Sequence, residues 1–437
     1  MVVAAGDITT FNIQHGFVEG LVRGFRSGFL DDVDYHHLTQ CESLEDVKLN
    51  LQETDYDQFL ADESTAVSPG LIQAGTTNKL VEEFLFLRAQ AAEPLGQFLD
   101  YITGELGSGG TYTNHGSITV RYEYMIDNVI LLLKGTLNGR DVNELIPQEL
   151  TYFYQLHPLG KFDDSIMRSI CAFEPNSKGY SDLYETVLID TPIGTYFSQF
   201  LEESASGDRM DGTSDVRNVL EEVQMELIKN SMLKLWLEDF YNFCQMRALF
   251  VQQTNFNRFT GFQKVGGDTG IIMGEILRAR ADRIAINITL NSFGTPLNEP
   301  AMRISDRKPL YPSIGALYPE ATERLSEAGD ESALGAALEP YPVYRKIWEI
   351  HQSQGVDNKS IDDAFYERDV EMCELAFQSQ MHFASFYAYV KLKEQEVRNI
   401  VWICECILQK QRDAINNFIP IFSDNAPWRS HNQGKKH

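Results

Sequence analysis

The stretch FYAYVKLKEQEVRNIVWICECI, residues 386–407, decides the fold class. It lies inside residues 356–419, which contain neither Gly nor Pro. Apolar side chains recur there in steps of three and four, which is the spacing of one face of an α-helix. Ser360, followed three residues later by Asp363, is typical of a helix start. Because the stretch is longer than a typical globular helix, we expect two or three helices, or one long helix with a bend.

One member of this apolar stripe is charged. Glu394 falls in phase between Val390 and Val397, and Arg398 follows one turn later. The spacing predicts an i,i+4 ion pair at the edge of the core, which stabilises by about 0.3–0.5 kcal/mol if it is exposed and has a larger effect if it is buried. A catalytic carboxylate is the alternative, and we favour the structural pair.

The composition limits the classes of function. The chain has 437 residues and a formal net charge of −26. Such a surface repels phosphate backbones, so the sequence predicts no nucleic-acid partner. The longest strictly apolar run, 129–133, is far shorter than a membrane span, and residues 1–10 lack the features of a signal peptide. We therefore expect a cytosolic protein that reaches membranes only through a partner.

Residues 11–38 are also helix-periodic. Gly20, Gly24 and Gly28 fall at every fourth position there, which predicts a face that another helix can approach closely. No strand precedes these glycines and no Lys-Ser/Thr pair follows them, so they do not form a nucleotide-binding loop.

Two segments, 38–60 and 325–348, share a layout in the sequence. Each has a leading Leu, an acidic capping zone, an apolar pair and then a Tyr before bulky residues. A looser third copy lies at 180–200. Three copies at a spacing of about 140 residues suggest three related helical units, with chance similarity among amphipathic helices as the alternative.

The sequence contains no complete catalytic or metal-binding constellation. The glycine-rich residues 104–121 lack the Gly-x-x-x-x-Gly-Lys-Ser/Thr pattern of a phosphate loop. Two aspartate groups come near the Mg²⁺–diphosphate motif of helical lyases. In the first, one Asp turns off the shared face, and the second lies in the first turn of a helix, where acidic residues are favourable in any case. The groups are Asp31, Asp32 and Asp34, and Asp362, Asp363 and Asp369. We therefore predict no cofactor and no metal, and favour an assembly or adaptor role over catalysis.

Several blocks of the chain resemble the C/AC39 family, the d subunits of V-type rotary ATPases. They run in family order from about residue 11 to residue 422. The most specific blocks are VKLKEQEVRNIVWICECI (390–407) and VLIDTP (187–192), and others are LTQCESLEDVKLNLQETDY (38–56), HPLGKFD (157–163) and ADRIAINITLNSFGT (281–295).

This resemblance implies an all-α fold in which three similar helical units form a pseudo-threefold, funnel-shaped arrangement. It implies a non-catalytic subunit of the membrane V0 sector, on the cytoplasmic face of the proteolipid c-ring. There it would couple rotation of the central stalk, driven by ATP hydrolysis, to proton translocation. The implied partners are the c-ring, the central-stalk subunits D and F, and the cytoplasmic domain of membrane subunit a. The implied location is the cytoplasmic face of acidic organelles such as the vacuole, the endosome or a lysosome-like compartment.

The resemblance also predicts the domain organisation. We expect residues 1–437 to form one C/AC39 domain. Family members run directly from the equivalent of DYIT into that of YEYMIDNV, so residues 104–121 are an expected insertion, and the chain is expected to be expanded near 246–266. The residues after Pro420 lack periodicity, and we expect 423–437 to be a mobile tail.

Among individual residues, Arg23 and Arg26 are candidates for the interface with the ring. Glu394 and Arg398 are expected to be structural. Two alternatives to the V0 role stay open: a free-standing all-helical scaffold or trafficking adaptor with the same fold, and, less favoured, a Mg²⁺-dependent helical lyase.

Overall fold

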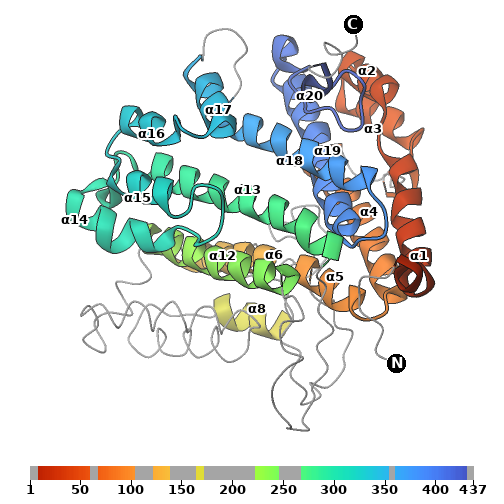
Figure 1. The fold of residues 1–437 in the computed structure, drawn as a ribbon. Helices are drawn as coiled ribbons and strands as arrows, with labels where there is room; N and C mark the ends of the chain where they lie inside the picture. The colour runs from red at the N-terminus through yellow and green to blue at the C-terminus, as the bar shows by residue number, and fades with distance from the viewer. Residues whose placement is uncertain are drawn as a thin grey trace, which may run out of the picture. The chain divides into compact units, whose positions relative to one another are not determined.

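Every regular element that the structure describes is a helix. The computed structural model describes residues 8–59, 67–103, 122–137, 164–171, 222–245, 267–353 and 360–430. Within these ranges there is no strand, so the predicted all-α class is confirmed (Figure 1). The predicted insertions 104–121 and 246–266 and the third repeat copy at 180–200 lie outside the described residues.

The helices follow one another along the chain without intervening sheets. The α-helices are α1 (Ile8–Gly24), α2 (Asp32–Gln40), α3 (Leu44–Gln52), α4 (Pro69–Gln90), α5 (Leu95–Thr103), α6 (Tyr122–Leu137), α8 (Asp164–Cys171), α12 (Glu222–Gln245), α13 (Gly267–Ser292), α14 (Pro300–Met302), α15 (Glu320–Glu327), α16 (Glu331–Leu338), α17 (Pro342–Gln352), α18 (Ile361–Gln378), α19 (Ala384–Leu408) and α20 (Pro427–Ser430). Short 3-10 or π-helical turns are η1 (Phe25–Gly28), η2 (Asp57–Phe59), η4 (Pro296–Asn298), η5 (Arg303–Arg307), η6 (Lys308–Leu310) and η7 (Arg412–Ala414).

The chain divides into two compact units, which are described separately. One unit comprises Met1–Gly96, Met246–Ile276 and Tyr341–His437, and the other comprises Gln97–Gln245 and Leu277–Pro340. The pseudo-threefold funnel implied by the family resemblance stays a prediction.

In the first unit, the long periodic stretch that opened the sequence analysis forms two helices, α18 and α19, which pack against each other. The chain between them, residues 379–383, supplies the break. Ser360 and Asp363 form the predicted cap at the start of α18, since each side chain accepts a hydrogen bond from the backbone N–H of the other residue. The prediction of more than one helix in this stretch is confirmed.

The two better repeat copies have matching structures. In each copy a capped helix, α3 or α16, buries its apolar pair, and the following tyrosine is also buried. The residues are Val47, Leu51 and Tyr56 in the first copy, and Leu334, Leu338 and Tyr344 in the second.

The glycine face of α1 differs from the prediction. A Cβ atom built on Gly20 or Gly24 meets no heavy atom of the described chain within 4 Å, so no described helix approaches there, and the prediction of close helix packing at these two residues is wrong. Gly28 is different, because a Cβ atom there would lie 2.1 Å from Oδ2 of Asp55. The repeated spacing combines one packed glycine with two open ones.

In the second unit, a buried arginine holds the end of a helix. Arg307, in η5, has no exposed surface. Its Nη2 donates to the carbonyl oxygens of Leu325, Ser326 and Ala328 at 3.0, 3.0 and 2.6 Å, where α15 ends. The C-terminal end of a helix carries partial negative charge, which compensates the guanidinium.

Part of the predicted mobile tail, 423–437, belongs to the described residues. Residues 423–430 include the short helix α20 and contact α2 and α18, as detailed below. Residues 431–437 lie outside the described part of the chain.

Candidate functional site: a buried polar network between α4 and α19

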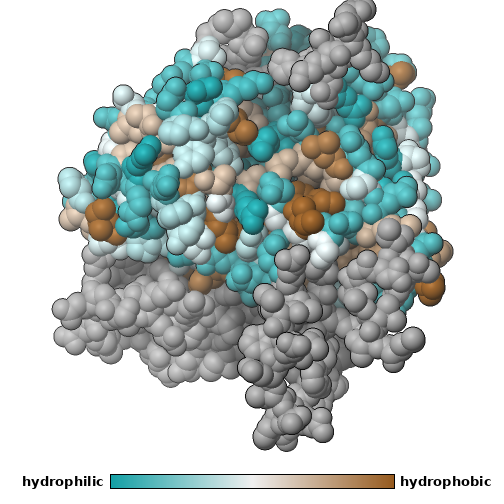
Figure 2. Space-filling model, viewed as in Figure 1, coloured by the Kyte–Doolittle hydropathy of each residue, from teal (hydrophilic) through white to brown (hydrophobic). Residues whose placement is uncertain are grey.

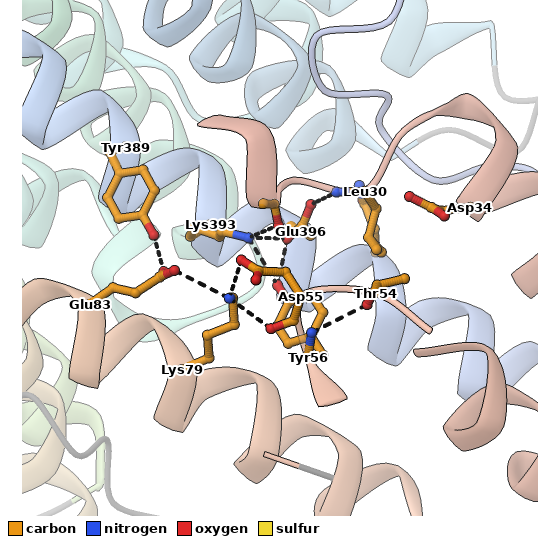
Figure 3. A network of polar contacts seen from close by, with 12 residues as sticks. Leu30, Asp34, Thr54, Asp55, Tyr56, Lys79, Glu83, Tyr389, Lys393 and Glu396 are labelled. Atoms are coloured by element: carbon orange, nitrogen blue, oxygen red, sulfur yellow. Dashed lines mark hydrogen bonds and ion pairs between the residues drawn. The ribbon is translucent and has the colours of Figure 1, made fainter. Parts of the chain in front are cut away.

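The side of α19 that faces α4 carries charged and phenolic side chains. Tyr389, Lys393 and Glu396 are spaced by four and three residues, so they share one face of the helix. All three are buried, and the helices α4 and α19 pack against each other (Figure 1). Figure 3 shows these side chains pointing toward groups from α4 and from two N-terminal loops.

The Glu396 carboxylate is the centre of the network. It accepts hydrogen bonds from Nζ of Lys393 at 2.7 Å, from the hydroxyl of Tyr56 at 2.5 Å and from the backbone N–H of Leu30 at 2.7 Å (Figure 3). Three charge-assisted bonds satisfy a carboxylate that has no exposed side-chain surface. One residue of α19 thereby fixes both the segment before α2 and the segment after α3.

Lys393 is satisfied as completely as its partner. Besides Glu396, its ammonium donates to the carbonyl oxygen of Gly28 at 2.8 Å. It also lies 4.3 Å from the ring centroid of Phe29 and 5.0 Å from that of Tyr56, distances at which aromatic faces attract a cation. These contacts compensate the loss of hydration of the buried charge.

A second lysine, on α4, continues the network. Nζ of Lys79 donates to Oδ2 of Asp55 at 2.5 Å and lies 3.2 Å from the carboxylate of Glu83. Glu83 in turn accepts a hydrogen bond from the hydroxyl of Tyr389 (Figure 3). The chain of contacts therefore runs from α19 to α4 and to the 54–56 loop, with three carboxylates and two ammonium groups.

The chemistry of the network is that of a structural joint. Burial, followed by the nearby Glu396 carboxylate, raises the pKa of Tyr56 well above its usual value, so this phenol stays neutral and donates its proton. Burial and Glu83 raise the pKa of Tyr389 in the same way. Within the described residues, no three His, Cys, Asp or Glu side chains gather as a metal site would require. The network holds protons and charges in place.

Arg23, one of the candidate interface residues, contacts its own chain. Its guanidinium donates to Oε1 of Glu19 and to the carbonyl oxygens of Phe377 and Ser379, at 2.7, 2.9 and 2.5 Å. Oε1 of Glu19 also accepts from the backbone N–H of Met381 at 2.9 Å. These two residues of α1 therefore hold the connection between α18 and α19.

The other three candidates lie nearer the surface. Arg26 is exposed, and its Cζ lies 4.2 Å from the ring centroid of Phe422. Nη2 of Arg398 lies 3.7 Å from Oε2 of Glu394, and Nζ of Lys391 is closer to that oxygen, at 3.1 Å. Burial raises the pKa of Glu394 to about 7, against the opposing effect of Arg398. The predicted i,i+4 pair is thus present, with a lysine as an additional partner.

The aspartates considered for Mg²⁺ binding serve as caps and ties. Asp31 and Asp34 form the capping box of α2, and Asp363 belongs to that of α18. Asp32 accepts a hydrogen bond from Oγ of Ser423 at 2.9 Å. These contacts explain why acidic residues occur at these positions without a metal.

Sequence reasoning did not identify the centre of the network. It singled out Glu394 in α19, whereas the fully buried pair is Lys393 and Glu396. A signal was available, because Lys393 and Glu396 are one turn apart and in phase with Tyr389. The partners Tyr56 and Lys79 are distant in sequence, and no periodicity connects them.

Comparison with known proteins identifies the family. Residues 18–106 and 119–418 match the family described as ATP synthase (C/AC39) subunit. The chain belongs to the C/AC39 family. The two matched stretches leave out residues 107–118, which fall inside the predicted insertion 104–121.

Full-length relatives of this C/AC39 chain carry one common name. It is 40% identical over 419 residues to the V-type proton ATPase subunit d of Dictyostelium discoideum, an alignment that covers 95% of this chain and 98% of the relative. It is 38% identical over 410 residues to subunit d2 of Arabidopsis thaliana, covering 94% and 97%. It is 36% identical over 413 residues to subunit d of Saccharomyces cerevisiae, covering 94% and 99%. The described helices of this C/AC39 chain include none that is long and apolar enough to cross a membrane.

Proposed function

We propose that this chain is the d subunit of the V0 sector of a V-type proton ATPase. It is a non-catalytic, peripheral part of that complex. It lies on the cytoplasmic face of the proteolipid c-ring, receives the central-stalk subunits D and F, and passes rotation driven by ATP hydrolysis to the ring that carries protons. Contact with the cytoplasmic domain of subunit a, at the membrane of a vacuole, endosome or lysosome-like compartment, belongs to the same proposal. The observation that carries it is the similarity to named d subunits over 94–95% of the chain.

The polar network suits a part that transmits torque. A coupling subunit must keep its shape while its partners pull on it, and buried hydrogen-bonded ion pairs have a defined geometry. Glu396 and Lys393 tie α19 to the segments around Gly28, Leu30 and Tyr56. We assign these residues the role of stiffening the first unit.

The contact with the ring is assigned to the open face of α1. Ile13 and Phe17 are 81% and 69% exposed, and Gly20 and Gly24 continue the same side of the helix. Arg26, the candidate interface cation, follows in η1 and is also exposed. On the side drawn in Figure 2, apolar residues form separate small patches in a mostly hydrophilic surface, so contacts through such patches are local.

Purification of the chain from membranes tests the proposal. A tagged full-length chain is captured from detergent-solubilised membranes, and the bound proteins are identified by mass spectrometry. We expect proteolipid together with central-stalk subunits. Recovery of a soluble protein with neither partner would exclude the V0 role and favour the free-standing scaffold.

A pair of substitutions tests the assigned face. Phe17→Asp is expected to reduce recovery of proteolipid, whereas Leu375→Asp on α18 leaves it unchanged, because both residues are largely exposed but only Phe17 lies on α1. Both changes are at the surface, so each should alter the free energy of unfolding by no more than about 0.5 kcal/mol. Equal recovery from both variants would place the contact elsewhere while leaving the V0 role intact.

A further inference from the structure

The segment that follows η7 is fixed at one point and then crosses to other elements. Nδ2 of Asn399, on α19, donates to the carbonyl oxygen of Ile419 at 2.6 Å, and Oδ1 of the same side chain accepts from the N–H of Ile419 at 3.1 Å. Ile419 and Ile421 are buried. Beyond this anchor, residues 422–429 reach α18 on one side and η1 and α2 on the other.

On α18, one buried carboxylate receives three donors from this segment. Glu374 is 4% exposed. It accepts from the backbone N–H of Phe422, from Nε1 of Trp428 at 3.1 Å and from Nη2 of Arg429 at 3.0 Å. All three donors lie in 422–429, so departure of the segment would leave Glu374 as a buried charge without these partners.

Toward the N-terminal helices, the segment makes polar and aromatic contacts. Oγ of Ser423 and Nδ2 of Asn425 donate to Oδ2 of Asp32 at 2.9 and 3.2 Å. The ring of Phe422 lies edge-on to the rings of Phe29 and Phe377, with centroid distances of 5.4 and 5.5 Å. Arg26 lies over the other side of the same ring, as described above.

The backbone at Phe422 is in the left-handed region, with φ of 55°. A residue with a large side chain rarely adopts this conformation unless its surroundings hold it there. Here the hydrogen bond to Glu374 and the two aromatic contacts supply that support.

We propose that residues 422–429 form a latch that joins η1 and the start of α2 to α18. The latch is closed in this structure. It opens as a unit about the anchor at Ile419, and opening releases Phe422, Glu374 and Asp32 together. Because Arg26 rests on Phe422, the state of the latch sets the position of that exposed cation. This inference does not depend on the role of the chain in the V0 sector.

Native-state hydrogen exchange of the full chain tests the latch. If 422–429 and the segment 25–34 open together, Glu374→Gln should speed exchange in both by a similar factor of about ten, because a charge-assisted bond is lost. Exchange in α12 and α13 should stay unchanged. Faster exchange in 422–429 alone, with 25–34 as in the parent protein, would overturn the proposal.

Two further variants keep the test decisive if Glu374→Gln affects the whole fold. Phe422→Leu keeps an apolar side chain but loses the ring under Arg26, and it should also speed exchange in both segments. Asp424→Asn is the matched control, since this carboxylate is exposed and contacts only Arg429 among the contacts given for its side chain, and it should leave 25–34 unchanged. Equal effects of Phe422→Leu and Asp424→Asn would contradict the latch.

Discussion

Lys393 and Glu396 form an ion pair with a distance of 2.7 Å between Nζ and Oε1, and their side chains are 1% and 0% exposed. They lie one turn apart on α19, yet their other partners come from the first 60 residues of the chain. A pair buried this completely contributes little if it is judged by its own attraction, but removal of one member leaves the other without compensation.

Replacement of Lys393 by Met should therefore destabilise the protein strongly. Glu396 keeps the Tyr56 hydroxyl and the Leu30 N–H but loses its cation, and we expect the free energy of unfolding to fall by about 3–5 kcal/mol. Urea unfolding at neutral pH measures the change. Arg345→Met is the control, because its pair with Glu349 is exposed, and it should cost less than about 1 kcal/mol. Equal losses in the two variants would show that burial of the pair has no special effect.

Glu394 should make stability depend on pH. Its pKa in the folded protein is raised to about 7 by burial, whereas in the unfolded chain it has the usual value of 4.5. Between these values the folded state binds more protons, so the contribution of Glu394 to stability falls as pH rises from about 4.5 to about 7. Glu394→Gln should remove this fall, and the difference between the two proteins should grow by roughly 1–3 kcal/mol across the interval.

Thermal or urea unfolding of both proteins at several pH values in this interval checks the prediction. Chemical-shift titration of the Glu394 carboxyl carbon gives the pKa directly. A midpoint near that of an ordinary glutamate would contradict the burial argument.

The glycines at four-residue spacing should respond differently to a methyl group. Gly20→Ala and Gly24→Ala add it to open space in α1, and each should stabilise the fold by about 0.5–1 kcal/mol because alanine favours the helix. Gly28→Ala brings Cβ within 2.1 Å of the Asp55 carboxylate, which must move away from Lys79, so it should destabilise. Thermal unfolding of the three variants provides the comparison, and a loss of stability at Gly20 would show that something covers this face in the free protein.

Arg307 should not tolerate exchange for lysine. Its Nη2 serves three carbonyl oxygens and Nη1 donates to Oγ of Ser292 at 2.7 Å, a geometry that one ammonium group cannot reproduce. We expect Arg307→Lys to lower the free energy of unfolding by about 2–4 kcal/mol, as unpaired buried carbonyls do. Arg324→Lys, on the exposed side of α15, should be nearly neutral. Urea unfolding distinguishes the two.

Sequence pattern predicted the helices well and the network poorly, for a physical reason. Periodicity identifies one apolar stripe, and α18 and α19 follow from it. However, α19 packs against α1, α3, α4 and α18, so residues off the stripe, including Lys393 and Glu396, are buried as well. A charge in such a position resembles a surface charge until its partners are known. The partner Tyr56 was noticed only as part of a repeat, and the open state of Gly20 and Gly24 depends on what does not pack against them.

The hydrogen bond between the N–H of Leu30 and Glu396 spans 366 positions of the chain. During synthesis, α1 to α4 leave the ribosome long before α19, so Lys79 and Tyr56 wait without their principal partners until the last tenth of the chain is made. Contacts this distant in sequence slow folding, and they make it dependent on the completed chain. A ribosome that stops before α19 therefore releases a product whose N-terminal helices cannot close, and such products are natural substrates for chaperones and proteases.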